Sequence, residues 1–141
     1  VVHCPTSNTF IGSGLFDMTL SCRINVGLAT DTGGGSSFSM LRTMAAAYDV
    51  SQLRGAPLHP AQLIWLATEG AAQTLHLSQH IGRLAPGQEA DLTILNLNAT
   101  PAIAQRAQRA DTLWDQLFPT IMMGDDRSIT AVYVQGRRVL Q

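Results

Sequence analysis

Short apolar runs separated by turn residues fill the first part of the chain, and two of these runs are typical of buried strands. The run at residues 1–4 ends at a proline, and the run at residues 25–31 ends in an acid close before three consecutive glycines. Short strands that are apolar throughout belong to sheets covered on both faces, which favours parallel pairing. Between them, the polar segment 6–14 predicts a loop, and the apolar spacing at 15–22 predicts a short helix.

Helical spacing dominates the segment that follows the glycines. Apolar residues recur every three or four positions from Ser36 or Ser37 to about residue 50, with a serine available as the N-cap. A second helix is predicted from Pro60, which suits a first helical turn, to about residue 75. The order strand, loop, strand, helix is typical of an α/β fold with parallel strands.

The pattern changes near residue 81, which is the one domain boundary that the sequence indicates. Residues 81–87 are rich in turn formers, residues 90–97 alternate like a half-buried strand, and residues 104–122 have helical spacing. Residues 129–140 predict a hairpin with a glycine in its turn. A few strands of this length do not make a stable sheet alone, so we expect them to need partners from elsewhere.

Composition and charge exclude several classes of function. The formal charge is −1, and the nine basic residues, all arginine, are dispersed, which argues against a surface for nucleic acid or for an acidic membrane. No apolar run is long enough for a membrane span. The two cysteines have no metal-binding or redox spacing, so we expect a reduced, cytoplasmic setting. The chain starts without methionine inside a predicted strand, and we expect it to be a piece of a longer protein.

Asp31 is the position at which chemistry is most clearly indicated. A carboxylate at the C-terminal end of a buried parallel strand lies where α/β barrels gather their catalytic groups, and the glycines that follow it allow a ligand to approach closely. The alternative is that Asp31 caps the next helix or binds loop amides, because aspartate is common in turns. Position alone leaves both interpretations open.

Four segments resemble the metal-dependent amidohydrolases that act on purines, triazines and related rings. Residues 3–8 (His-Cys-Pro-Thr-Ser-Asn) are similar to the segment after the seventh strand of their (β/α)8 barrel, and residues 26–31 are similar to the eighth strand. Residues 30–42 resemble guanine deaminases in particular, and residues 81–92 resemble the strand by which the chain leaves the barrel.

The resemblance implies an α/β fold made of the C-terminal portion of a (β/α)8 TIM barrel plus strands of a small β-sandwich. Residues 1–80 are then the last two β/α units of the barrel, strands 7 and 8 with the helices that follow them. Residues 81–141 return to the β-sandwich and contain one intervening helix.

The resemblance also implies a zinc site to which this chain contributes one ligand. In the family, one zinc is held by a His-x-His pair, by further histidines, and by the aspartate that ends strand 8. Asp31 takes that last role, as metal ligand and catalytic residue. None of the four histidines of this chain stands in a His-x-His pair, so the chain has no complete zinc site of its own. We expect His59, His76 and His80 to be solvated or to cap helices.

Five further residues are expected close to the metal or the substrate: His3, Ser7, Asn8, Thr32 and Gly33. His3 either supports the site from strand 7 or packs as a hydrogen-bonded strand residue. Ser7 and Asn8 either hydrogen-bond near the metal ligand or form an Asx-type turn.

The activity implied by the resemblance is the hydrolytic deamination of guanine to xanthine and ammonia by a zinc-activated water, in an enzyme that is a homodimer. Two alternatives stay open. Another aminohydrolase or chlorohydrolase, acting on an adenosine derivative, cytosine or a triazine, has the same strand-7 and strand-8 motifs. In the second alternative, the chain is a folded, non-catalytic piece in which the motifs are relics.

Overall fold

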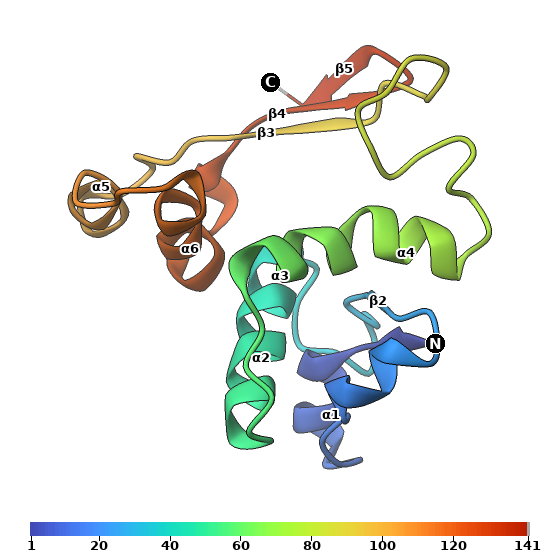
Figure 1. Ribbon diagram of the computed structural model, residues 1–141. Helices are drawn as coiled ribbons and strands as arrows, with labels where there is room; N and C mark the ends of the chain where they lie inside the picture. The colour runs from blue at the N-terminus through green and yellow to red at the C-terminus, as the bar shows by residue number, and fades with distance from the viewer. Residues whose placement is uncertain (141) are drawn as a thin grey trace.

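The structure, a computed structural model, describes residues 1–140 and opens with two short parallel strands (Figure 1). β1 (Val2–His3) pairs with β2 (Gly27–Leu28), and His3 lies opposite Leu28. The chain between the two strands forms helix α1 (Pro5–Ile11) and the 3-10 helix η1 (Met18–Cys22). The parallel pairing predicted from the apolar runs is confirmed.

Three helices follow β2, namely α2 (Met40–Leu53), α3 (Pro60–Ala67) and α4 (Glu69–Thr74). Helix α4 packs so closely on β2 that a Cβ added to Gly27 would lie 2.6 Å from the Cα of Ala71. Glycine is therefore required at position 27 by the approach of helix to strand.

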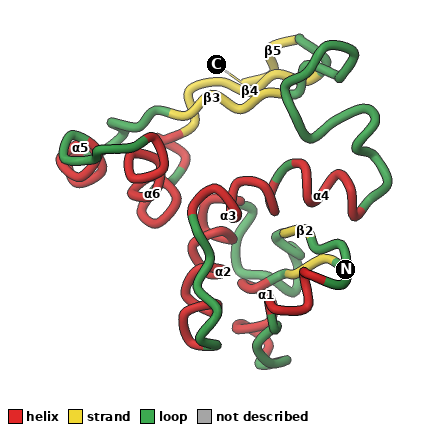
Figure 2. The backbone as a smooth tube through the Cα atoms, in the orientation of Figure 1, coloured by secondary structure: helices red, strands yellow, loops and turns green. Residues whose placement is uncertain are grey.

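The C-terminal part contains a second sheet. β3 (Leu92–Leu95), β4 (Ile129–Val134) and β5 (Arg137–Leu140) pair antiparallel in the order β3-β4-β5. Helices α5 (Pro101–Ala107) and α6 (Leu113–Met123) and the 3-10 helix η2 (Asp126–Ser128) lie between β3 and β4. Figures 1 and 2 show this sheet apart from β1 and β2, with α6 returning to pack on α2 and α3.

The hydrophobic core lies where the helices meet the parallel strands. Its buried side chains come mainly from β2, α2, α3 and α6, with Met18 of η1, and include Leu28, Met44, Leu63 and Ile121. The three-stranded sheet is different, because every side chain of β5 is exposed and β3 contributes no buried residue. Among residues 1–140, no helix combines the length and the hydropathy that crossing a bilayer requires.

Two sequence predictions about helices are wrong in extent. The predicted helix from Pro60 to about residue 75 is interrupted at Thr68, whose dihedral angles are not helical. The break lets the ring of Trp65 lie against Gly70, where a Cβ would be 2.6 Å from the ring. The predicted helix at residues 104–122 is two helices, because Thr100 and Thr112 each cap a separate start through the side-chain oxygen.

The loop predicted at residues 6–14 is also wrong in its first half, which is α1. Pro5 occupies the first helical turn, and Gly12 ends the helix in a left-handed conformation with φ of 70°. This pairing of an early proline with a terminal glycine is a known helix signal that the polar composition concealed. The short helix expected at 15–22 is the 3-10 helix η1, and the hairpin β4–β5 forms as predicted.

Candidate active site

Asp31 follows β2 in a backbone conformation that most residues avoid. Its φ is 48°, in the left-handed region, and its carbonyl accepts a hydrogen bond of 2.5 Å from the amide of Gly35. The turn is so tight that a Cβ on Gly35 would collide with the carbonyl oxygen of Thr30. The surrounding turn stabilises this conformation, which aspartate adopts more readily than most residues, and it fixes the direction in which the carboxylate leaves β2.

Helix α1 lies directly against this turn. The hydroxyl of Thr6 donates a 3.4 Å hydrogen bond to the carbonyl of Thr30, which ties the first turn of α1 to the end of β2. Ser7, the next residue, is buried, and its hydroxyl lies against Gly34. The carboxylate of Asp31 lies against the same glycine. The structure therefore brings Ser7 and Asp31, which are 24 residues apart in sequence, to one glycine.

Cys4 is within the electrostatic influence of Asp31, and nothing in its sequence spacing marks it as part of the site. Burial of the thiol and the negative charge of Asp31 both raise the pKa of Cys4. This influence shows that the thiol and the carboxylate are within electrostatic reach of each other. The thiol of half-buried Cys4 is consequently held in its neutral form at pH 7.

His3 lies on β1 but in apolar surroundings. Its side chain is buried, its ring stacks on Phe16 with centroids 4.9 Å apart, and within the described residues neither ring nitrogen has a hydrogen-bond partner. Burial lowers the pKa of His3 to about 4, so the ring is neutral at pH 7. The hydrogen bonds expected for a packed strand histidine are missing from the described structure.

Asn8, Thr32 and Gly33 occupy the rim of the turn. The carbonyl of Asn8 accepts from the amide of Ser13, and its side-chain oxygen accepts from the Ser13 hydroxyl, so Asn8 closes the end of α1. Thr32 and Gly33 are exposed, and the Thr32 hydroxyl donates to the carbonyl of Ser37. These contacts shape the loops and do not bring Asn8 to the carboxylate.

The other histidines lie away from Asp31. His59 caps α3, where its Nδ1 accepts a 3.1 Å hydrogen bond from the amide of Ala61 and the Gln62 side chain accepts from the amide of His59. His76 and His80 are exposed beyond α4. The capping or solvated roles predicted for these three are confirmed. In the described part of the chain, no three His, Cys, Asp or Glu side chains come together as a metal site.

Asp31 nevertheless fits the role of one ligand in a metal site whose other ligands lie outside the residues of this chain. Its carboxylate is a suitable oxygen donor for zinc, the residue is exposed, and no side chain projects from the three glycines beside it. A metal could therefore reach the carboxylate from solvent. The remaining ligands have to come from outside these residues.

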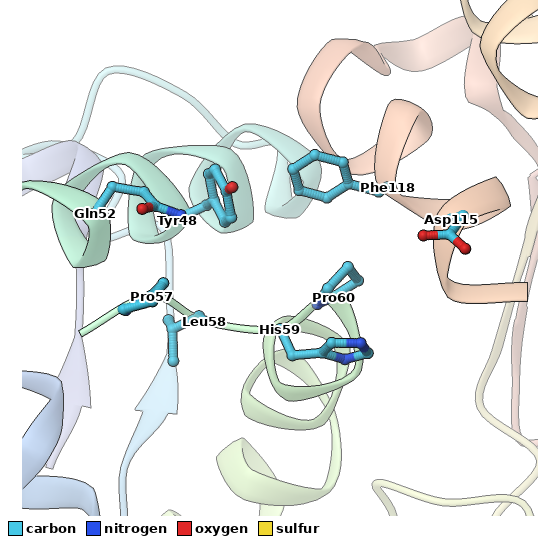
Figure 3. Close-up of a pocket in the computed structure, with 8 residues that line it drawn as sticks. All are labelled: Tyr48, Gln52, Pro57, Leu58, His59, Pro60, Asp115 and Phe118. Carbon is cyan, nitrogen blue, oxygen red and sulfur yellow. The ribbon is translucent and has the colours of Figure 1, made fainter. Parts of the chain in front are cut away.

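A separate hollow of about 400 Å³ lies between α2, the start of α3 and α6 (Figure 3). Its walls include Tyr48 and Phe118, whose rings meet edge to face at 4.9 Å, together with His59 and Asp115. None of the residues that the sequence singles out around Asp31 lines this hollow. We therefore place the candidate site at Asp31, because the chemistry and the backbone strain are there.

The family is decided by a match to the model of the Amidohydrolase family over residues 1–139. The chain belongs to this family. The amidohydrolase relatives include guanine deaminase of Escherichia coli (strain K12), which is 42% identical over 143 residues that cover 100% of this chain and 33% of the relative. The chain spans about a third of the length of the curated relatives it matches.

Solved amidohydrolase structures agree with the α/β fold of this chain. Escherichia coli guanine deaminase matches with a TM-score of 0.95 at 42% identity, over 99% of this chain and 33% of that one. Guanine deaminase from Bradyrhizobium japonicum matches with a TM-score of 0.93 at 30% identity, over 100% and 37%. Guanine deaminase from C. acetobutylicum, with guanine bound in its active site, matches with a TM-score of 0.81 at 28% identity, over 99% and 33%.

Proposed function

We propose that this chain is part of a guanine deaminase and carries one ligand of its zinc site. The observation that carries the proposal is Asp31, strained and exposed at the end of a parallel strand, in a chain with close matches to guanine deaminases over its whole length. β1 and β2 then correspond to strands 7 and 8 of a TIM barrel within residues 1–80. Residues 81–141 then belong mainly to a small β-sandwich.

The reaction is the hydrolysis of guanine to xanthine and ammonia. A bound zinc would supply a water of lowered pKa, able at neutral pH to add to the C2 carbon of the ring. Asp31 would be one of the residues that hold the metal. Its carboxylate would also accept a proton from the attacking water and deliver it to the amino group, which leaves as ammonia. The groups that recognise the purine edge and protonate the ring nitrogen come from the rest of the protein.

The residues around Asp31 support this role in different ways. Ser7 and the glycine turn shape the carboxylate site, while Thr32 and Gly33 form the rim that guanine approaches. Asn8 and His3 stabilise the loop and the strand beneath it. The complete enzyme acts as a cytoplasmic homodimer, as the resemblance implies.

The test is a hybrid protein in which this chain replaces the third of Escherichia coli guanine deaminase that it matches. We expect the hybrid to bind zinc and to convert guanine to xanthine, followed by absorbance. Asp31→Ala and Asp31→Asn should lower kcat at least about 10³-fold, because removing a metal-bound proton acceptor removes a step of the reaction. A matched control is Asp49→Asn on α2, which should leave turnover unchanged.

The outcomes separate the alternatives. A hybrid that folds and binds zinc but does not turn over guanine would show that this part of the chain belongs to an amidohydrolase of another specificity, such as one for an adenosine derivative, cytosine or a triazine. A folded hybrid that binds no zinc would support a non-catalytic piece. Full activity of Asp31→Ala would show that the carboxylate is not the catalytic ligand.

A further inference from the structure

Ser7 is the polar side chain of α1 that is most deeply buried beside Asp31. It is 1% exposed, and its neighbour Thr6 bonds to the carbonyl of Thr30. The first turn of α1 is therefore fixed relative to the end of β2. The hydroxyl of Ser7 is consequently kept beside the carboxylate, on a residue that is almost fully buried.

Gly34 separates the two side chains. A Cβ added to Gly34 would lie 2.9 Å from Oγ of Ser7 and 3.0 Å from Oδ2 of Asp31. The hydroxyl and the carboxylate thus occupy the space that any side chain at position 34 would need. The φ of Gly34 is not left-handed, whereas that of Gly33 is 117° with open space around it. Gly34 is needed for space, and Gly33 for its backbone conformation.

We infer that Ser7 is a positioning residue for Asp31. Its hydroxyl would donate a hydrogen bond to Oδ2 of Asp31, directly after a small rotation or through one bridging water, and would hold the carboxylate in an orientation suited to metal binding. Within residues 1–140 as described no direct hydrogen bond joins the two side chains, and we expect it in the complete site, where further ligands and the metal would fix the carboxylate. Carboxylates that bind metals are generally held by such second hydrogen bonds.

This inference rests on the proposed function, because it assigns Ser7 a role toward a metal ligand. It adds a residue from a different element, and it explains why a serine of α1 is buried against a glycine that follows β2. It also gives Gly34 a role that its backbone conformation does not require.

The test uses the same hybrid and measures zinc affinity by competition with a chelator, together with kcat and KM for guanine. We expect Ser7→Ala to weaken zinc binding about 10- to 100-fold, the usual cost of losing a partner of a metal ligand. KM for guanine should change little while kcat falls. Ser36→Ala, at an exposed serine of the same loop, is the matched control and should retain zinc affinity.

Gly34→Ala tests the geometry without removing the hydroxyl. Its Cβ displaces the Ser7 hydroxyl and the Asp31 carboxylate, so zinc affinity should fall as in Ser7→Ala. The melting temperature of the zinc-free protein should stay close to that of the parent. Gly55→Ala, after α2, is the control, because Gly55 is also left-handed with φ of 71° and its Cβ meets open space; it should lower the melting temperature and leave the zinc affinity of the folded protein nearly unchanged.

The results distinguish two failures. Zinc affinity within twofold of the parent in both Ser7→Ala and Gly34→Ala overturns the role of Ser7, even if Asp31→Ala abolishes binding. Unchanged zinc affinity in Asp31→Ala instead overturns the proposed function, on which the role of Ser7 depends.

Discussion

His3 is a buried ionisable residue whose environment disfavours its charged form. The ring is enclosed beside Phe16, and in the described structure neither nitrogen finds a partner. Burial lowers its pKa to about 4, below the value near 6.5 of an exposed histidine. The residue therefore packs as a neutral ring in the strand next to the one that ends at Asp31.

This burial predicts a loss of stability in acid. In the unfolded state His3 takes up a proton near pH 6.5, whereas in the folded state it does so only near pH 4. Its contribution is therefore fully present above pH 6.5 and is lost as the pH falls toward 4, by about 3 kcal/mol at most. Urea denaturation of the hybrid at pH 7.5 and pH 4.5 measures this loss.

Two variants assign the effect to His3. His3→Leu removes the ionisable ring from an apolar site, so its unfolding free energy should depend less steeply on pH. His80→Gln changes an exposed histidine and should keep the pH dependence of the parent. The same dependence in His3→Leu and in the parent would contradict the prediction.

The arrangement of the helices and strands depends on tertiary contacts that the spacing of residues along the sequence does not show. The motif residues 3–8 form the end of β1 and the first turn of α1, and this turn meets Asp31 only because β1 and β2 pair in parallel. The strand positions, the α2 region and the hairpin were predictable from apolar periodicity and turn residues. The break at Thr68 was not, because the apolar spacing stays helical across it and the contact of Trp65 with Gly70 exists only in the folded chain.

Gly27→Ala should separate β2 from α4. The added Cβ would lie 2.6 Å from the Cα of Ala71, and a backbone atom cannot move aside as a flexible side chain can. We expect the hybrid to lose about 1–3 kcal/mol of unfolding free energy, the usual cost of overpacking, measured by urea denaturation. Ala29→Ser, a small change two residues along the same segment, serves as the control, and equal stability of Gly27→Ala and the parent would contradict the close packing.

At the scale of the whole molecule, much apolar surface has no cover within the described chain. Ile94, Val134, Val139 and Leu140 are exposed on the three-stranded sheet, and Phe38 and Leu84 are exposed on loops. Exposed apolar side chains together with open strand edges favour association. The two-stranded parallel sheet also has two free edges. Residues 1–140 thus expose apolar side chains and strand edges that are suited to packing against additional polypeptide.

We therefore expect the 141-residue chain by itself to associate and to lack a sharp thermal transition. Light scattering coupled to size-exclusion chromatography and a thermal scan by circular dichroism measure both properties. The hybrid is the control, because the rest of the relative supplies partners for the strands and the apolar faces, and it should melt cooperatively. A monomeric, cooperatively melting 141-residue chain would contradict this expectation.

The sequence by itself determined the α/β class and the family, and it predicted Asp31 as a metal ligand. Apolar periodicity, turn residues and the order of motifs are local features of the sequence. They can be recognised without knowing which elements pack together. Only the tertiary structure decided that Ser7 and Asp31 meet at Gly34, that the charge of Asp31 acts on Cys4, that His3 is enclosed beside Phe16, and that two predicted helices break. These features depend on contacts between residues far apart in the chain, and spacing along a sequence carries no record of such distances.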